Sequence, residues 1–108
     1  MANTRIFGPA QLTNAAATKY TVPTGMALDL TWIHVENPAG STATKWTLSI
    51  GADAAGTRLF DGEALVPGGG ARDYYPNVAT LVAAEIIQAF ADVTASIVMT
   101  LNGFLRAV

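Results

Sequence analysis

The sequence predicts an all-β protein, a single-domain antiparallel β-sandwich with a jelly-roll-like arrangement of about eight short strands. Two observations carry this prediction. Segments such as Lys45-Trp-Thr-Leu-Ser-Ile50 alternate apolar and polar side chains, which is the pattern of a strand with one buried face. Turn-forming residues interrupt such segments at roughly every eight to twelve positions, a spacing that is typical of sandwiches.

The size and composition of the chain favour one domain that works among neighbours. Its 108 residues suit a single hydrophobic core, and residues 1–16 are expected to form an N-terminal arm or an edge strand. Only 13% of the residues are charged, whereas 51% are hydrophobic. A small domain has much surface per residue, so this balance leaves apolar area exposed unless another chain covers it. Small residues raise the hydrophobic share without making sticky patches, yet we expect a homo-oligomer or a larger assembly.

The charge pattern argues against nucleic acid and membrane partners. The formal net charge is −2, and the six basic residues are scattered singly instead of forming the basic stripe of a nucleic-acid binder. The N-terminal segment lacks the apolar stretch of a signal peptide, and no apolar run approaches the roughly 18 residues of a membrane span. With no cysteine, the chain has neither disulfides nor thiolate metal sites, and no cofactor is expected.

Two strands in the first half of the chain are predicted most clearly. Residues 26–36 form the longest strand, with Trp32 on its apolar face, and residues 43–50 form a second strand with Trp46 on its inward face. Because residues 37–41 are rich in turn formers, the two strands are expected to pair as a hairpin.

The second half of the chain reads as shorter strands. Residues 57–60 and 63–66 are expected to be separate strands around a tight turn at Asp61-Gly62. Residues 77–84 fit helical spacing as well as irregular structure, so a turn of helix or a loop is expected there. The remaining predicted strands are residues 19–22, 72–75, 85–91 and 95–101. Residues 104–108 are expected to form an apolar tail.

Side chains suited to catalysis or metal binding are few. His34 is the only histidine, and it has no cysteine or nucleophile-elbow serine to activate, so a structural or interface role is expected. Asp53, Asp61 and Glu63 lie close in sequence, but they lack the ligand spacing of a calcium loop and are expected to be solvated turn residues. We therefore expect that the chain is not an enzyme.

The aromatic residues are the other candidates for a binding site. Trp32, Trp46, Tyr20, Tyr74 and Tyr75 would form the platform of a carbohydrate-binding module if their rings were exposed. The two tryptophans lie on the apolar faces of predicted strands, which favours core packing for both. Adjacent residues of a strand point to opposite faces, so one ring of Tyr74-Tyr75 is expected to be available at the surface or an interface.

Several phrases of the sequence carry a resemblance to a known group of proteins. They are Thr4-Arg-Ile-Phe-Gly-Pro-Ala-Gln-Leu-Thr13, Lys19-Tyr-Thr-Val-Pro23, Ile33-His-Val-Glu-Asn37 and Ser49-Ile-Gly-Ala-Asp-Ala-Ala-Gly-Thr-Arg-Leu-Phe60. In these phrases and in its strand plan the chain resembles small β-rich virion accessory proteins of tailed bacteriophages, of the head decoration or minor tail type. The resemblance covers most of the chain and brings no catalytic residues with it.

The resemblance implies a structural protein of the virion, assembled in the host cytoplasm. The leading expectation is a capsid decoration protein that cements the outer head surface by binding the major capsid protein. A minor tail or fibre-associated protein that binds tail proteins is the alternative, and a carbohydrate-binding β-sandwich module is the alternative of another class, with a host glycan as ligand. The residues expected at interfaces come from three regions: Arg5, Ile6, Phe7, Arg72, Tyr74, Tyr75, Phe104, Leu105 and Val108.

Overall fold

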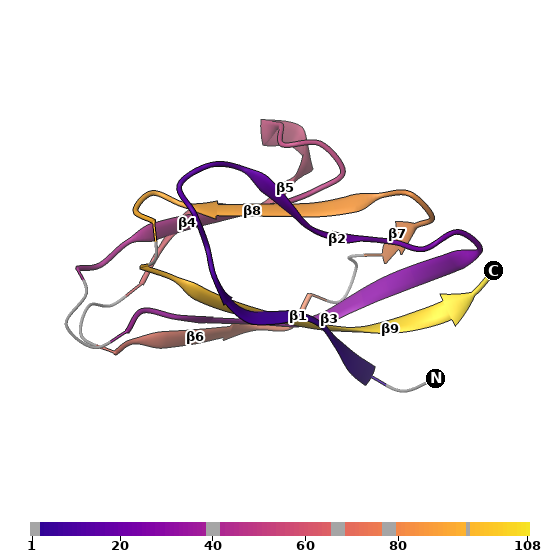
Figure 1. Ribbon diagram of the computed structural model, residues 1–108, viewed down its shortest axis with the longest axis horizontal. Helices are drawn as coiled ribbons and strands as arrows, with labels where there is room; N and C mark the ends of the chain where they lie inside the picture. Colours follow the sequence, from indigo (N-terminus) through magenta and orange to yellow (C-terminus); the bar gives the residue numbers. More distant parts are fainter. Residues whose placement is uncertain (1–2, 39–41, 66–68, 77–79, 95) are drawn as a thin grey trace.

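The chain folds into two antiparallel sheets packed face to face (Figure 1). The computed structural model describes every residue except 1–2, 39–41, 66–68, 77–79 and 95. The described residues form nine strands and one short 3-10 helix, η1 (Ala55–Thr57). The predicted all-β sandwich is therefore confirmed.

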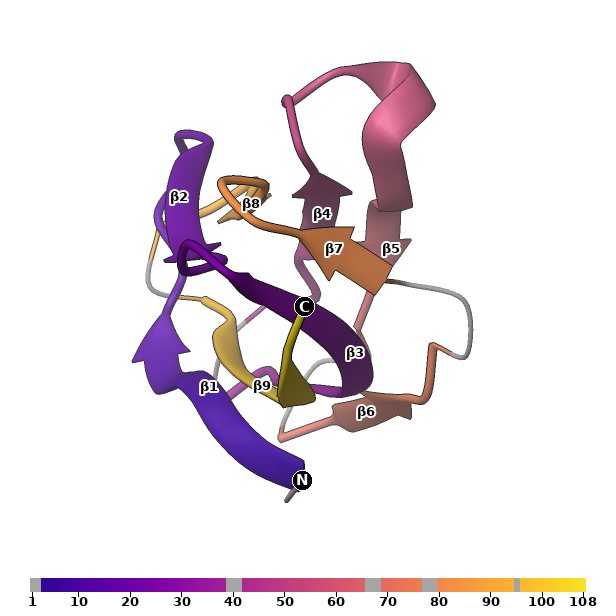
Figure 2. The same ribbon diagram turned by 90° about the vertical axis from the view of Figure 1, so that its right-hand side faces the viewer.

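The first sheet, called sheet A, contains both the beginning and the end of the described chain. It has five strands, with β7 beside the first half of β3 and β6 beside its second half (Figure 2). Across the sheet the order is β1 (Asn3–Gln11), β9 (Val98–Ala107), β3 (Met26–Glu36) and β6 (Ala71–Tyr74). The short strand β7 (Thr80–Val82) also pairs with β3.

The second sheet, called sheet B, has four strands. In order they are β2 (Ala17–Thr21), β8 (Ile86–Ala91), β4 (Lys45–Ile50) and β5 (Arg58–Ala64). Together the two orders give a jelly roll. The first strand pairs with the last, β2 pairs with β8, β3 pairs with β6 and β7, and β4 pairs with β5. Strands of the first half of the chain thus pair with strands of the second half in reverse order, as in jelly-roll domains.

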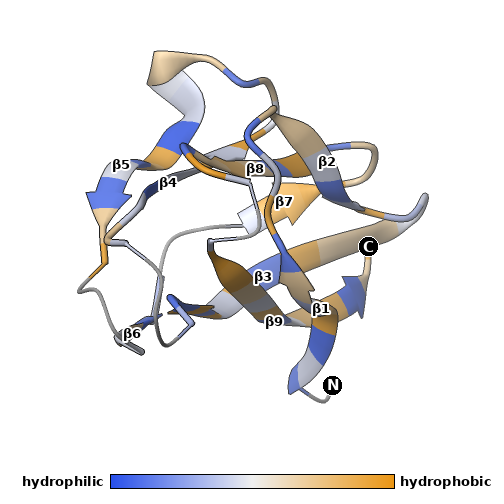
Figure 3. Cartoon of the chain, turned by 60° about the vertical axis from the view of Figure 1, so that its left-hand side comes forward, coloured by the Kyte–Doolittle hydropathy of each residue, from blue (hydrophilic) through white to orange (hydrophobic). Residues whose placement is uncertain are grey.

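The core lies between the sheets and follows the alternation of side chains along each strand. In β8, Ile87 and Ala89 are buried while their neighbours are partly exposed, and Figure 3 shows polar and apolar residues following one another along β3. Trp46 and Phe60 of sheet B pack against Tyr74 of sheet A, with ring centroids 4.5 to 5.6 Å apart. This aromatic cluster ties the two sheets together.

A β-bulge in the middle of β3 reverses which face its side chains occupy. Leu30 pairs with Gly103 and Trp32 pairs with the adjacent Asn102, so Thr31 is an extra residue in β3. Leu30 points into the core before the bulge, and the alternation resumes one residue out of phase after it. Trp32 therefore lies on the outer face of sheet A, partly exposed.

The expected core packing of the two tryptophans is thus half right. Trp46 is fully buried, whereas the prediction for Trp32 is wrong because the bulge moves Ile33 and Val35 into the core positions instead. A strict alternation through residues 26–36 places Trp32 with Leu30. One inserted residue is enough to send it to the opposite face.

Two predicted hairpins are also wrong. Residues 26–36 and 43–50 lie in different sheets, as β3 and β4, so they do not pair; residues 39–41 of the predicted turn lie outside the described residues. The predicted turn at Asp61-Gly62 lies inside the continuous strand β5, where Gly62 has a φ of +71°. The register of β5 against β4 shifts at this point, so the dipeptide forms a bulge instead of a turn.

The ambiguous segment and the apolar tail both belong to strands. Within residues 77–84, for which a helical turn or a loop was expected, Thr80–Val82 is strand β7, paired with β3, and residues 77–79 lie outside the described residues. Pairing with β3 and the full burial of Leu81 outweigh the helical spacing. The predicted tail 104–108 is largely the second half of β9, and its Leu105 packs against the core.

The N-terminal segment forms the edge strand β1 of sheet A, and Gly8 is the position at which it approaches β9 most closely. Gly8 has a φ of +76°, and a Cβ atom placed there would lie 2.1 Å from the carbonyl oxygen of Met99. Gly25 has nearly the same φ, +77°, but a Cβ atom there would contact nothing within 4 Å. A side chain at Gly25 would therefore meet backbone strain alone, whereas one at Gly8 would meet both strain and a steric clash.

We predict that Gly8→Ala destabilises the fold by about 2 kcal/mol more than Gly25→Ala does, because only the first change forces β1 away from β9. Gly25→Ala should cost about 1 kcal/mol, the strain of a left-handed alanine. Urea unfolding of both variants measures the difference. Equal losses would mean that β1 does not approach β9 as described.

Candidate functional site

The outer face of sheet A, which points away from sheet B, carries a mixture of polar and aromatic side chains. Residues opposite each other in neighbouring strands share a face, and the pairs His34 with Asp73 and Arg5 with Asn102 place these four side chains together. The bulge adds Trp32 to the same face. Four strands that are distant in sequence therefore contribute to one surface.

Two adjoining hollows cross this face and share three lining residues, Trp32, His34 and Asn102. The first has a volume of about 630 Å³ and the second about 580 Å³, within the usual range of ligand sites. We call the combined depression the central groove. It is lined by Asn3, Arg5, Pro9, Thr31, Trp32, His34, Glu36, Asp73, Tyr75, Thr100 and Asn102.

His34 is held between two carboxylates in the middle of the groove. Its Nδ1 lies 2.6 Å from Oδ1 of Asp73, and its Nε2 lies 2.9 Å from Oε1 of Glu36. An ionised carboxylate only accepts hydrogen bonds, so both ring nitrogens donate in this arrangement. The geometry is that of a charged imidazolium, which bridges β3 and β6.

The ionisation of this cluster follows from its contacts. Partial burial by itself lowers the pKa of His34, but the hydrogen bonds to Asp73 and Glu36 and their negative charges outweigh this and raise the pKa above 6.5. The hydrogen bond from His34 lowers the pKa of Asp73, and the bond from the Trp32 indole acts in the same direction against desolvation. Each partner thus stabilises the charged form of the other.

Trp32 is fixed in place by two contacts. Its Nε1 donates to Oδ1 of Asp73 at 3.0 Å, and its ring stacks on that of His34, with the centroids 5.4 Å apart. These contacts restrain a large aromatic side chain on the outer face of the sheet. A restrained ring on an open face loses little conformational entropy when a ligand packs against it.

Amides and a hydroxyl complete the groove beside the aromatic rings. The hydroxyl of Thr31 donates to Oδ1 of Asn3 at 2.7 Å, and it also lies 3.2 Å from the carbonyl oxygen of Asn102. The side-chain oxygen of Asn102 is buried and accepts no hydrogen bond from any of the residues that the structure describes. Because this oxygen has almost no accessible surface, a ligand in the groove would contact the rest of the Asn102 side chain instead.

The residues expected at interfaces all lie in or next to strands of sheet A. Arg5 and Tyr75 line the central groove, and the Tyr75 side chain is 73% exposed. Arg72 and Val108 are exposed and Phe104 is partly exposed. The remaining four are partly buried against the core: Ile6, Phe7, Tyr74 and Leu105.

The adjacent tyrosines behave as the strand pattern predicts. Tyr74 turns toward the aromatic cluster of the core, and Tyr75 turns to the surface. Among the groove residues that sequence reasoning did not select are Asp73, Thr100 and Asn102. Cross-strand register brings them beside His34 and Arg5, and no local signal in the sequence reports it.

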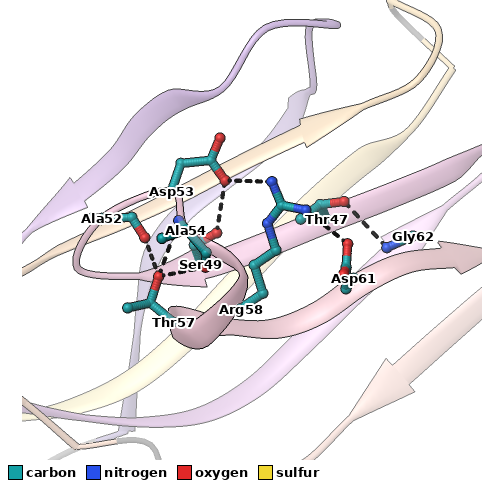
Figure 4. A network of polar contacts seen from close by, with 9 residues as sticks. All are labelled: Thr47, Ser49, Ala52, Asp53, Ala54, Thr57, Arg58, Asp61 and Gly62. Atoms are coloured by element: carbon teal, nitrogen blue, oxygen red, sulfur yellow. Dashed lines mark hydrogen bonds and ion pairs between the residues drawn. The ribbon is translucent and has the colours of Figure 1, made fainter.

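Two of the three carboxylates considered as calcium ligands, Asp53 and Asp61, belong to a separate cluster on the outer side of sheet B (Figure 4). Arg58 donates to Asp61 at 2.9 Å and to Asp53 at 3.2 Å, and Asp53 also accepts from the hydroxyl of Ser49. The hydroxyl of Thr47 accepts from the backbone of Gly62. This network covers β4 and explains why Thr47 and Ser49 are buried although an outward face was expected.

The arrangement of acidic and histidine side chains does not converge on a metal position. In the part of the chain that the structure describes, no group of three histidine, cysteine, aspartate or glutamate residues could hold a metal ion. Asp73 and Glu36 approach opposite nitrogens of the His34 ring instead of a common point. The described residues also contain no helix of the length and apolarity needed to cross a membrane.

Neither the known protein families nor the curated protein sequences include a match to this chain. Its chemistry is therefore argued from the geometry. The central groove offers aromatic rings, amide and hydroxyl groups, and balanced charges from Arg5, His34, Glu36 and Asp73. Such a surface suits reversible binding.

We predict that the stabilisation supplied by His34 depends on pH. Because the folded-state pKa of His34 is raised, its contribution is complete below pH 6.5 and is lost as pH rises through the folded-state pKa. Urea unfolding of wild-type protein and His34→Gln across this range should show a stability difference that shrinks with rising pH. A difference that stays constant would contradict the charged cluster.

A second prediction concerns the two tryptophans. Acrylamide should quench Trp32 readily and Trp46 hardly at all, because the first lies on an open face and the second has no exposed surface. Wild-type fluorescence should therefore show two classes of emitter, and Trp32→Phe should leave only the protected class. Uniform protection in the wild type would place Trp32 in the core and refute the bulge.

Proposed function

We propose that this chain is a structural protein of a tailed-bacteriophage virion, where it decorates the outer surface of the head by binding the major capsid protein. The resemblance in sequence phrases and the low share of charged residues, 13%, support this proposal. The jelly roll is compatible with it, since viral capsid proteins use the fold, but lectins and cupins use it as well. What favours capsid binding is a particular surface of the protein.

That surface is an apolar patch at the end of the sandwich that carries the C-terminal end of β9 (Figure 1). Val82 and Val108 are 58% and 77% exposed. Val82 pairs with Ala27 of β3, which in turn pairs with Arg106 of β9, and the backbone amide of Val108 donates to the carbonyl of Gly25. The two valines therefore flank the beginning of β3, although β7 and β9 are far apart in sequence.

The composition of the patch matches that of a protein interface. Phe104, one of the residues expected at an interface, lies in the adjacent row of β9 and is partly exposed. Asp29 lies opposite Phe104 and forms an ion pair of 3.2 Å with Arg106, while the hydroxyl of Thr80 donates to Asp29. Asp29 and Arg106 lie among Val82, Phe104 and Val108, and because the two charges are paired, a partner that covers the patch leaves neither charge alone. The exposure of these apolar side chains is the observation on which the proposal rests, and a coat subunit is the partner proposed to bury them.

The alternative within the same class is a minor tail or fibre-associated protein. The same patch would then bind a tail protein, and the chemistry of the contact would be unchanged. Location in the particle separates the two. Fractionation of heads and tails, with quantification of the chain in each, assigns it: recovery with heads at high copy number supports decoration, and recovery with tails supports the alternative.

We predict that a lysine in the apolar patch prevents particle binding. Val82→Lys or Val108→Lys would bury an unpaired charge at the interface, which costs on the order of 3 kcal/mol and weakens binding about 100-fold. Co-sedimentation with purified heads that lack the protein measures the effect.

Val93→Lys is the matched control. Val93 is 55% exposed, and it follows β8 at the opposite end of the sandwich (Figure 1), so this change should leave binding unaltered. Equal binding by all three variants would remove the patch from the interface. Failure of the wild-type protein to bind either heads or tails would refute the virion assignment.

A further inference from the structure

We propose that the central groove of sheet A is a binding site for a neutral oligosaccharide. The groove shares no lining residue with the apolar patch, although its Asn3 pairs with Phe104 of the patch. Binding is a property of the isolated chain. Sugar binding can therefore be measured without a virion. Its result is independent of whether the chain binds phage heads.

The aromatic residues of the groove offer what a sugar ring needs on its apolar face. Trp32 is restrained by its hydrogen bond to Asp73 and its stacking on His34, and Tyr75 lines the same hollow with most of its side chain exposed. Aromatic rings pack favourably against flat surfaces with polarised hydrogens. A sugar ring presents such a face through its C–H groups, together with a rim of hydroxyls.

The polar residues provide acceptors and donors for those hydroxyls. Asp73 and Glu36 each contact His34 through one carboxylate oxygen, so each retains hydrogen-bonding capacity for a hydroxyl donor. Asn102 lines both hollows, and an amide side chain can exchange hydrogen bonds with hydroxyl groups.

The charge of the groove selects against ionic ligands. Arg5 and protonated His34 balance Glu36 and Asp73. Both carboxylates stand beside His34, so a phosphate or uronic acid placed there would meet negative charge and lose hydration. Arg5, which forms no ion pair with a described residue, lines the second hollow only. A neutral ligand with many hydroxyl groups avoids this cost.

The size of the groove favours several sugar rings over one. Its lining residues come from four adjacent strands, β1, β9, β3 and β6, together with the residue after β6, and adjacent strands are about 4.8 Å apart. The two hollows continue into each other at Trp32. An oligosaccharide lying across the strands would therefore contact both hollows, with Trp32 beneath its centre.

The test is an array of neutral oligosaccharides built from glucose, galactose, mannose, rhamnose and N-acetylhexosamines, followed by titration calorimetry with the best probe. We expect saturable binding by the wild-type chain. Trp32→Ala should weaken it at least about tenfold, because the central stacking contact is lost. Tyr75→Ala should also weaken it, and because that side chain is 73% exposed, this variant keeps the fold intact.

Phe90→Ala is the matched control, since Phe90 is a partly exposed aromatic residue of β8 in sheet B. It should bind as the wild-type protein does, and thermal unfolding confirms that each variant is folded. Absence of binding to every neutral probe would overturn the proposal. So would equal affinities of the wild type, Trp32→Ala and Tyr75→Ala, or tighter binding of a galacturonic acid oligomer than of any neutral sugar.

Discussion

The surface chemistry of this protein depends on one extra residue in β3. Without Thr31, the alternation of the strand would bury Trp32 and turn Ile33 and Val35 outward. The close approach of β9 makes the bulge compatible with the sheet: a Cβ atom on Gly103 would lie 2.8 Å from the carbonyl oxygen of Asp29. A glycine opposite the bulge and an inserted threonine thus create an aromatic, polar face on a strand that also builds the core.

The cluster of His34, Asp73 and Glu36 connects that face to stability. The imidazolium joins β3 to β6, a short edge strand of four residues, through a 2.6 Å contact with Asp73. Asp73 also receives the indole proton of Trp32, so one carboxylate positions both rings. The groove and the apolar patch lie on the same sheet but differ in character, which is consistent with one surface for protein contact and another for a small ligand.

The fold class could be predicted from sequence because it depends on local patterns. The order of apolar and polar residues predicts strands at 43–50 and 85–91, and the structure has strands β4 and β8 there. The predicted hairpins failed because a turn-rich connection such as 37–41 allows either pairing with the next strand or a crossing to the other sheet. At Asp61-Gly62 the same glycine chemistry serves a bulge, since a positive φ suits both structures.

The sequence by itself determined the all-β class, the buried position of Trp46, the opposite orientations of Tyr74 and Tyr75, and the scarcity of reactive groups. Only the tertiary structure decided that Trp32 is exposed and that His34 lies between Asp73 and Glu36. The physical reason is the range of the contacts: Trp32 and Asp73 are 41 residues apart, and His34 and Asp73 are 39 apart. Alternation along one strand is a local property, whereas bulges and cross-strand partners are set by the register of the whole sheet.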